Sequence, residues 1–314
     1  MTICPNNQSE CHGDILSYIK KIIVPYGCND VPQRMGGGYT SEIFKVKTSF
    51  GIHIIKISFQ DDLPSEIFFL KRAAVHNIRV PRVISYDFSK KEIPYDYCIL
   101  EYFDGIRANE LSDSKKYEAG ALFGKELRKI HAIPVENFGK ISYANTFDNH
   151  NDWAHILLHR ILEVKKEVDT IHASFSNGED IFLEKILTDK YRYVDTPRLI
   201  HSDPGGNNFL VQYNKQNEIT NYRIIDPNEL VGGDPLYDLA FSQLVWNHQP
   251  FMDGVLKGYE AIRLTDEEKH RFMVLNMYLH YWASIASYAR GWNIWKRLYE
   301  EYQKRKKELT CITS

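Results

Sequence analysis

Cysteine, long apolar runs and excess positive charge are all scarce in this sequence. Its five cysteines are widely spaced and form no C-x-x-C pair or Cys/His cluster, so neither a disulfide framework nor a zinc site is expected. No apolar stretch approaches the roughly 20 residues that a membrane-spanning helix needs. Lysine and arginine number 39 against 41 acidic residues, which leaves no basic excess to neutralise the phosphates of a nucleic acid.

No targeting signal is expected either. The first residues, MTICPNNQSECHGD, contain neither the basic nor the apolar segment of a secretory signal. We therefore expect a cytoplasmic protein whose partners include no nucleic acid and no membrane. With 314 residues, 43% hydrophobic and 25% charged, the chain is long enough for two lobes with cores of their own.

The first hundred residues have the pattern of β-strands around one helix. SEIFKVKTS and IHIIKISF are rich in β-branched and aromatic residues and meet at Phe50-Gly51, which predicts a hairpin, and PYDYCILEYF predicts a further strand. Between them, residues 65–76 carry apolar side chains at helical spacing, with Ser65 as the expected N-cap. We expect a small amino-terminal lobe over residues 1–103.

In the rest of the chain the apolar period becomes helical. Apolar side chains recur at helix spacing over residues 119–130 and 153–168, and two further helices are expected between residues 266 and 308, with a break near Gly291. Two short β-type segments, FLVQY and YRIID, interrupt this pattern and are joined by a polar turn, which predicts a small hairpin. Residues 104–314 are therefore expected to form a larger, mainly helical lobe.

The segment LIHSDPGGNNFLV places three polar side chains close together just before that hairpin. Asp203 and Asn208 lie in this segment, and Asp226 lies at the far end of the hairpin. Carboxylate and amide oxygens are the donors that Mg²⁺ takes when it is bound through one or two carboxylates and the phosphates of a substrate. The hairpin thus predicts one half of a site for a magnesium-bound phosphate.

The small lobe offers the other half of such a site. MGGGYTSEIFKV has three consecutive glycines between two expected strands, where backbone N–H groups can approach an anion closely. Lys56 lies in the middle of an apolar strand, where an ammonium group is costly unless it is paired. Glu66 in the next helix is the expected partner, and Glu42, in the strand that follows the glycines, is the alternative.

In this order the motifs resemble the aminoglycoside phosphotransferases, antibiotic kinases that share the protein-kinase-like fold with choline kinases. His201-x-Asp203-x-x-x-x-Asn208 is similar to the catalytic loop of that family, and IIDPNELVGGDPLYDLA to its metal-binding strand and G-D-P-x-x-D-L-A signature. GGGYTSEIFKV resembles its nucleotide loop and LEYFDG its hinge between lobes, so the resemblance runs from about Gly36 to Ala240. It implies an α+β, bilobal protein-kinase-like fold with an antiparallel sheet and one helix in the small lobe.

The resemblance also implies a role for each polar residue of the large lobe. Asp203 would accept the proton of the substrate hydroxyl, and Asn208 and Asp226 would hold Mg²⁺ against the nucleotide phosphates. His201 and Asp238 would support the loop. Positioning and charge neutralisation supply most of the catalysis in phosphoryl transfer, which is why these residue types are required.

ATP or GTP is the cosubstrate that the resemblance implies. Backbone amides of the glycine-rich loop would cover its phosphates, Lys56 held by Glu66 would bind two of them, and main-chain groups of the hinge would bond adenine between apolar side chains. The expected nucleotide-binding residues are Gly37, Gly38, Tyr39, Thr40, Lys56, Glu66, Glu101, Phe103, Leu210 and Ile225, with Ile54 beside the last two.

Two departures from the family pattern leave alternatives open. The loop reads D-P-G-G-N-N, so Asn207 competes with Asn208 as metal ligand, although the spacing from Asp203 favours Asn208. Lys56 and Glu66 are also closer in sequence than the family pattern leads us to expect.

The first functional hypothesis is a kinase that phosphorylates a hydroxyl of an aminoglycoside-like antibiotic and so confers resistance. A second keeps the chemistry and changes the acceptor to choline, a sugar, another small metabolite or a macrolide. A third, of another class, is a kinase-shaped protein that binds its ligand without turnover. The sequence leaves open the acceptor hydroxyl, the choice between ATP and GTP, and the oligomeric state.

Overall fold

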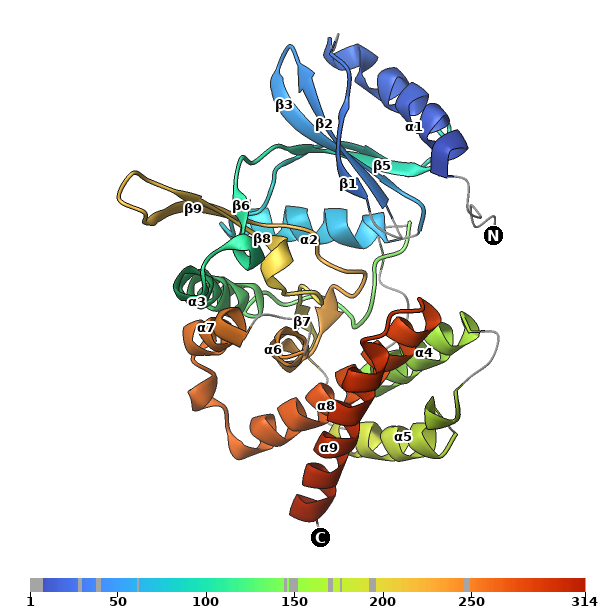
Figure 1. The fold of residues 1–314 in the computed structure, drawn as a ribbon, viewed down its shortest axis with the longest axis vertical. Coiled ribbons are helices and arrows are strands. Elements are labelled where there is room, and N and C mark those ends of the chain that lie inside the picture. Colours follow the sequence, from blue (N-terminus) through green and yellow to red (C-terminus); the bar gives the residue numbers. More distant parts are fainter. Residues whose placement is uncertain are drawn as a thin grey trace.

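A computed structural model describes residues 8–27, 30–37, 41–60, 62–143, 146, 152–168, 172–175, 177–191, 196–244 and 249–313. The chain is bilobal: a sheet with two helices forms the small lobe, and the remaining helices form the large one (Figure 1). The predictions made for Gly38, Tyr39 and Thr40 lie outside the described residues. None of the helices in the described ranges is long and apolar enough to cross a membrane.

The small lobe is built on a five-stranded sheet in which each strand is antiparallel to its neighbours. Its strands, in the order β1-β2-β3-β5-β4, are β1 (Gln33–Gly37), β2 (Ser41–Thr48), β3 (Gly51–Ser58), β5 (Asp96–Glu101) and β4 (Val83–Asp87). The hairpin predicted at Phe50-Gly51 is confirmed. Because side chains alternate along a strand, Ile55 and Ile57 face one side of the sheet and Lys56 the other.

Helices α1 (Gln8–Ile23) and α2 (Leu63–Val75) cover opposite faces of this sheet (Figure 1). Ile19 and Ile22 of α1 pack with Ile55 in a cluster on the outer face. The expectation of a single helix in the small lobe was wrong, because α1 was not predicted. The described apolar side chains of α1 lie in its second half, and its first turns read QSECHGD, which carries no helical apolar stripe.

The start of α2 also differs from the prediction. Ser65 is not the N-cap: the helix begins at Leu63 after Asp62, and Pro64 lies in its first turn. Proline is favoured there because its missing N–H would have no helical partner. The buried Ser65 hydroxyl instead accepts a hydrogen bond of 2.9 Å from the backbone N–H of Ile141.

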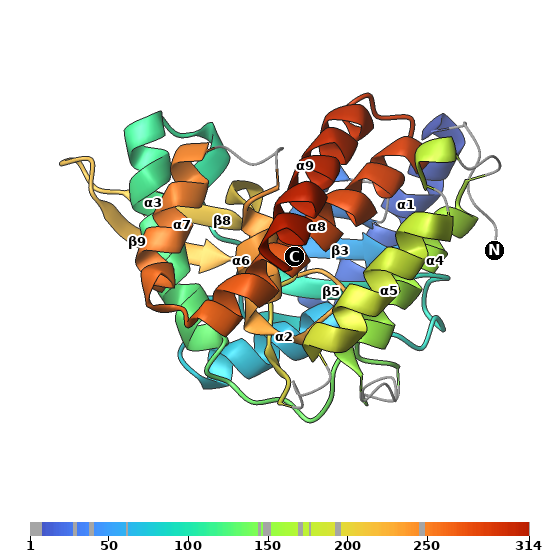
Figure 2. The same cartoon turned by 90° about the horizontal axis from the view of Figure 1, so that it is seen from below.

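The large lobe is mainly helical, as predicted. Its helices are α3 (Asp113–Ile130), α4 (Trp153–Lys166), α5 (Asn177–Tyr191), α6 (Pro235–Ser242), α7 (Gln249–Tyr259), α8 (Asp266–Ala289) and α9 (Trp295–Thr313). Figure 2 shows α3 beside α7 on one side of the lobe, and α4, α5, α8 and α9 on the other. The predicted break at Gly291 is confirmed, since this glycine has a φ of +69° just after α8.

Helices α3 and α7 approach each other closely along a line of glycines. A Cβ atom added to Gly124 would lie 2.2 Å from the carbonyl oxygen of Val255, and one added to Gly258 would lie 1.9 Å from that of Ala121. Real Cβ atoms do not approach an oxygen this closely, so the two backbones could not keep their positions with any larger residue there. We refer to this contact below as the glycine seam.

Two small sheets position the polar segments of the large lobe. The predicted hairpin is confirmed as β8 (Phe209–Tyr213) and β9 (Ile219–Ile224), with β6 (Ile106–Arg107) on the other side of β8. Strand β7 (Arg198–Leu199) pairs with β10 (Gly232–Gly233). The segment with Asp203 therefore connects β7 to β8, and Asp226 directly follows β9. The expected lobe boundary after residue 103 stays a prediction.

Candidate active site

A buried carboxylate holds the loop between β7 and β8 through the backbone of that loop. Asp238, in the first turn of α6, is fully buried and accepts hydrogen bonds of 2.7 Å from the N–H groups of His201 and Ser202. Ser202 has a φ of +57°, a conformation that costs free energy for a residue other than glycine. Two hydrogen bonds to an ionised group can offset that cost, so Asp238 fixes the loop in a strained form.

His131 supports Asp238, and Tyr259 supports His131. Neither residue was predicted from the sequence. His131, which directly follows α3, donates from Nε2 to Asp238 Oδ2 over 2.9 Å. Its Nδ1 accepts from the hydroxyl of Tyr259, the last residue of α7, also over 2.9 Å. No short motif contains these residues, since 107 positions separate His131 from Asp238.

Asp203 and Asn208 contact each other across the loop. The carboxamide nitrogen of Asn208 donates to the backbone oxygen of Asp203 at 3.0 Å and to its carboxylate Oδ2 at 2.9 Å. Asn208 is 7% exposed, whereas Asn207 is exposed. The geometry therefore favours Asn208 over Asn207, as the spacing did, and leaves the amide oxygen of Asn208 available to a metal ion.

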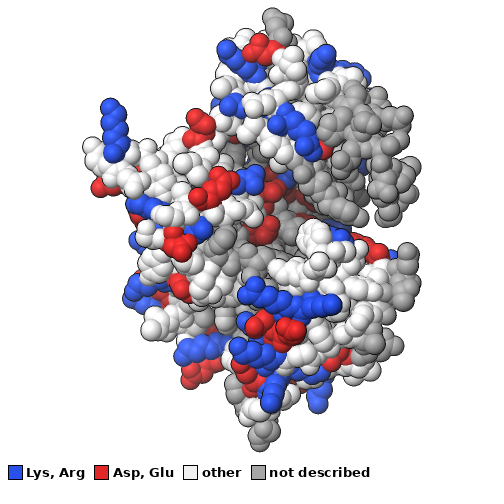
Figure 3. All heavy atoms as spheres, viewed as in Figure 1, with Lys and Arg blue, Asp and Glu red and all other residues white. Residues whose placement is uncertain are grey.

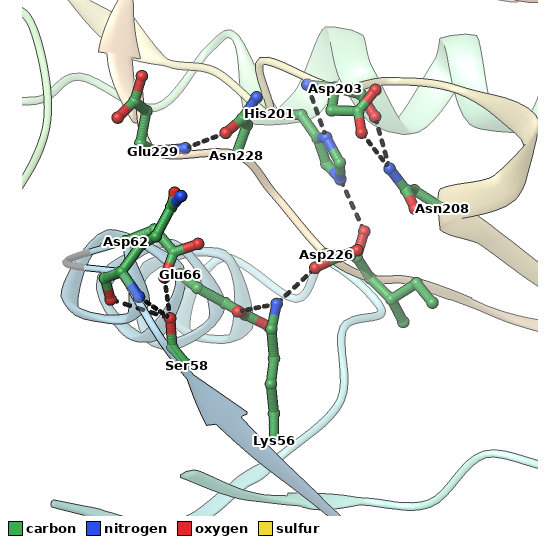
Figure 4. A network of polar contacts seen from close by, with 12 residues as sticks. Lys56, Ser58, Asp62, Glu66, His201, Asp203, Asn208, Asp226, Asn228 and Glu229 are labelled. Carbon is green, nitrogen blue, oxygen red and sulfur yellow. Dashed lines mark hydrogen bonds and ion pairs between the residues drawn. The ribbon is translucent and has the colours of Figure 1, made fainter. Parts of the chain in front are cut away.

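Lys56 reaches from the small lobe to the large one. Its ammonium group lies 2.7 Å from Glu66 Oε2 and 2.6 Å from Asp226 Oδ1, between the two carboxylates (Figure 4). The short connection from β3 to α2 brings the first turn of α2 directly beside Lys56, which explains why Glu66 can follow so closely in sequence. Glu42 is already paired with Arg34, at 2.7 and 2.8 Å, so it is not the partner of Lys56.

These three charges change one another's protonation. Desolvation opposes the charge on Lys56, but Asp226 and Glu66 outweigh it and raise the Lys56 pKa well above its usual value. Burial raises the pKa of Glu66, more than the nearby ammonium lowers it. Desolvation acts against ionisation of Asp226 too, yet Lys56 holds the Asp226 pKa below its usual value. Asp226 is thus the carboxylate that stays charged.

The pKa of Asp203 is the one expected of a general base at neutral pH. Burial, followed by the negative charges of Asp226 and Asp238, raises the pKa of Asp203 to about 7, against the opposing hydrogen bond from Asn208. A general base acts best when its pKa lies near the working pH. The same carboxylate stays partly accessible at the loop surface, so an incoming hydroxyl can reach it.

His201 does not take part as a titrating group. Burial lowers its pKa, and its Nε2 donates to the carbonyl of Ile225 at 3.0 Å while Nδ1 accepts from the N–H of Asp203 at 3.3 Å. A neutral imidazole meets both contacts. His201 therefore ties the loop to the end of β9, next to Asp226.

The oxygens that point into the space between the lobes fit a hard cation. Asp226 has a φ of +56°, and its side chain is 49% exposed, with one oxygen bonded to Lys56 and the other without a hydrogen bond from any described residue. The amide oxygen of Asn208 lies on the facing loop (Figure 4). Carboxylate and amide oxygens of this kind suit Mg²⁺. Figure 3 shows that the surface is hollowed here and that acidic side chains gather in the hollow.

The predicted hinge offers one main-chain donor to a base. The N–H of Glu101 already donates to the carbonyl of Arg82 at 2.9 Å, and the carbonyl of Phe103 accepts from Gly105 at 3.1 Å. Within the described residues the N–H of Phe103 has no hydrogen-bond partner. A Cβ atom on Gly105 would come within 2.6 Å of the Phe103 ring, so this glycine allows the hinge to fold against that ring.

The three apolar residues expected beside the base lie in strands or directly after one. Ile54 on β3, Leu210 on β8 and Ile225 after β9 are each half-buried. Gly37, at the end of β1, pairs with Glu42 of β2, which places the start of the glycine-rich loop at the edge of the sheet. Of the residues predicted for nucleotide binding, the structure joins Lys56 to Glu66 and places Phe103 and Leu210 together beside Gly105; their role stays a prediction.

A lobe with a five-stranded sheet, whose lysine pairs with an aspartate of a mainly helical lobe, defines a kinase-like fold. The chain belongs to the phosphotransferase enzyme family: the family model matches residues 33–273. No curated protein sequence matches the chain significantly.

Solved structures with the same fold include kinases of several acceptors. A thermostable mutant of aminoglycoside phosphotransferase APH(4)-Ia, in a ternary complex with ADP and hygromycin B, is 17% identical, with a TM-score of 0.63 over 90% of this chain and 97% of that one. A choline/ethanolamine kinase family protein from Mesorhizobium loti is 17% identical, with a TM-score of 0.61 over 93% of each chain. A protein assigned as a fructosamine-3-kinase from Haemophilus somnus 129PT is 16% identical, with a TM-score of 0.61 over 94% and 96%. At these identities the likeness shows the fold alone.

Proposed function

We propose that the protein is a Mg²⁺-dependent kinase that transfers the γ-phosphate of ATP or GTP to a hydroxyl of an aminoglycoside-like antibiotic and thereby confers resistance. The observation that carries this proposal is the placement of Asp203, Asn208 and Asp226 on neighbouring segments of the large lobe, where Lys56 of the small lobe reaches Asp226 (Figure 4). Kinship with a family of phosphotransferases, and a similar structure that holds ADP and hygromycin B, support it.

Each residue then has a task that its environment suits. Asp203 accepts the proton of the acceptor hydroxyl, because its raised pKa makes it a competent base near neutral pH. Lys56 contributes positive charge to the nucleotide phosphates and is oriented by Glu66. Asn208 and Asp226 would hold Mg²⁺, which supplies charge neutralisation for the phosphoryl group as it transfers.

An acceptor screen tests the proposal. Purified protein with Mg²⁺ and either ATP or GTP is assayed for nucleoside diphosphate release in the presence of hygromycin B, streptomycin or kanamycin, with the Asp203→Asn variant as control. We expect antibiotic-stimulated release from the wild type and none from the variant. Stimulation by no antibiotic, or equal stimulation of the variant, would contradict the proposal.

A second candidate keeps the chemistry and changes the acceptor. Structures of a choline/ethanolamine kinase family protein and of a protein assigned as a fructosamine-3-kinase resemble this chain nearly as well as the antibiotic kinase does. Choline, ethanolamine and a fructosamine therefore belong in the same screen, and stimulation by one of them alone would select this candidate. Nucleotide binding without turnover of any acceptor would favour a non-catalytic binding protein. A cytoplasmic location stays a prediction.

A further inference from the structure

A groove lies on the side of α2 that faces away from Lys56. It encloses about 450 Å³, which is within the range of ligand sites, roughly 300–1,000 Å³. Its walls come from α2, the end of β4 and the segment that follows Ile141. The lining residues are Pro64, Ile67, Phe68, Lys71, Arg72, Val75, Tyr86, Phe88, Ser142 and Tyr143.

The walls of this groove are fixed by contacts of their own. Ile141 is bonded to Ser65 of α2 at 2.9 Å, and the hydroxyl of Tyr143 donates to the buried carboxylate of Asp96 at 2.6 Å. The ring of Phe88 packs against both Tyr86 and Tyr143, with centroids 4.9 and 6.1 Å away. The groove is therefore a formed cavity with apolar and aromatic walls.

Two cationic side chains of this groove have no acidic partner among the described residues. In that part of the chain, Lys71 contacts the hydroxyl of Tyr86, at 2.8 Å, and the face of its ring, at 4.2 Å. Arg72 donates to the carbonyl of Pro134 at 3.3 Å, and its Nε atom is buried without a partner in the part of the chain that the structure describes. None of the ten lining residues is acidic. An apolar cavity with uncompensated positive charge is complementary to an apolar body that carries an anion.

We propose that this α2 groove is a binding site for a small amphipathic anion, with an aromatic or branched apolar body and one carboxylate or similar group. Phe68, Lys71 and Val75 recur at helical spacing on the groove side of α2. Glu66, Leu70 and Ala73 are buried on its other side, so the groove is separate from the nucleotide cleft. The site does not depend on the proposed function.

The same helix contributes to both sites, and this gives the groove a means of acting on the cleft. A ligand that packs against Ile67 and Phe68 touches the residues that directly follow Glu66. Any shift of α2 on binding would therefore change the position of the carboxylate that holds Lys56. Binding itself is the claim to be tested first.

A pair of probes that differ only in charge tests the chemistry. Diphenylacetate and diphenylacetamide are titrated into the full chain by calorimetry. We expect saturable binding of one diphenylacetate per chain and roughly tenfold weaker binding of the amide, because hydrogen bonds to a charged group contribute about that much. Equal affinities for the two probes, or no saturable binding of diphenylacetate, would overturn the proposal.

Two variants and their controls locate the binding. Val75 is 76% exposed at the end of the groove and Val24 is 72% exposed elsewhere, so Val75→Glu and Val24→Glu add the same charge with little risk to folding. Val75→Glu should weaken diphenylacetate several-fold and Val24→Glu should not. The double variant Lys71→Gln/Arg72→Gln should bind diphenylacetate roughly tenfold more weakly. Lys257→Gln, in the large lobe, should leave the affinity unchanged. Equal effects of groove variants and controls would show that the probe binds elsewhere and would overturn the site.

Discussion

On the large-lobe side of the cleft, backbone N–H groups hold the loop that carries Asp203, whereas on the small-lobe side only side-chain charges hold Lys56. The loop is bonded to a fully buried Asp238, which His131 supports in turn. Among the described residues, the ammonium group of Lys56 is held by Glu66 and Asp226. If the proposed roles hold, the side that carries Asp203 is organised before any ligand binds, while Lys56 can rearrange when phosphates compete for its ammonium group.

Replacing the proposed base should have the largest effect on the reaction. Asp203→Asn removes the proton acceptor and keeps the side-chain shape, so turnover should fall by roughly a hundredfold to ten-thousandfold. Nucleotide affinity, measured by calorimetry with Mg²⁺, should stay close to that of the wild type, because the nucleotide is held mainly from the other side. A variant with unchanged turnover would refute the role of Asp203.

The support of the loop should matter for stability as well as for turnover. Asp238→Asn replaces one acceptor of a backbone N–H by a donor, at a position that is fully buried. Since hydrogen bonds to charged groups contribute about 1.5–3 kcal/mol each, the free energy of unfolding should fall by about 3 kcal/mol. Urea denaturation measures this loss. A loss no larger than that of a typical surface substitution would show that Asp238 does not hold the loop as described.

The two adjacent asparagines provide a matched test of the proposed metal ligands. Asn208→Ala should weaken nucleotide binding in the presence of Mg²⁺ by roughly tenfold, the effect of losing one charge-assisted contact. Asn207→Ala, at an exposed neighbour, should have little effect. Calorimetry with and without Mg²⁺ separates a metal ligand from a merely structural residue, because only the former loses its effect when the metal is left out. A larger effect at Asn207 would reverse the assignment.

On the small-lobe side, loss of one charge should change binding more than folding. Glu66→Gln keeps a hydrogen-bond acceptor for Lys56 but removes the ion pair, so the KM for nucleotide should rise several-fold with kcat less affected. Its melting temperature should change less than that of Asp238→Asn, because burial already disfavours the charge on Glu66. If Glu66→Gln unfolds as readily as Asp238→Asn, the two sides of the cleft do not differ as described.

A last prediction concerns the pH dependence of stability. The pKa of Asp203 is raised from 3.8 to about 7, so between these values the folded chain binds a proton that the unfolded chain releases. This group's contribution to stability is complete below pH 3.8 and is lost as pH rises through about 7. The stability of Asp203→Asn relative to the wild type should therefore increase between pH 4 and pH 8, as thermal denaturation across that range can show. A constant difference would contradict the raised pKa.

The parts of the site that follow one another closely in sequence were predicted well. Asp203, Asn208 and Asp226 lie on one loop and one hairpin, so their spacing alone brings them together. Lys56 and Glu66 were paired correctly because an ammonium group inside an apolar strand requires a nearby acid.

Other contacts depend on distant parts of the chain and left no local pattern. His131 and Tyr259 meet Asp238 only after α3, α6 and α7 have packed together. Helix α1 was missed for a local reason, since its first turns are polar, and the N-cap was misplaced because Pro64 was not given its preferred place in the first turn.

The glycine seam fixes the distance between α3 and α7. The ends of both helices lead to the loop that carries Asp203. His131 caps α3 and Tyr259 ends α7. The hydrogen bond between them depends on how far apart the helices lie, and His131 in turn bonds Asp238. A methyl group added at Gly124 or Gly258 would therefore push the two helices apart. That displacement would move the loop that carries Asp203, although the methyl group does not contact this loop. Substitutions at these two glycines are therefore expected to lower turnover even though every residue of the proposed nucleotide site is unchanged.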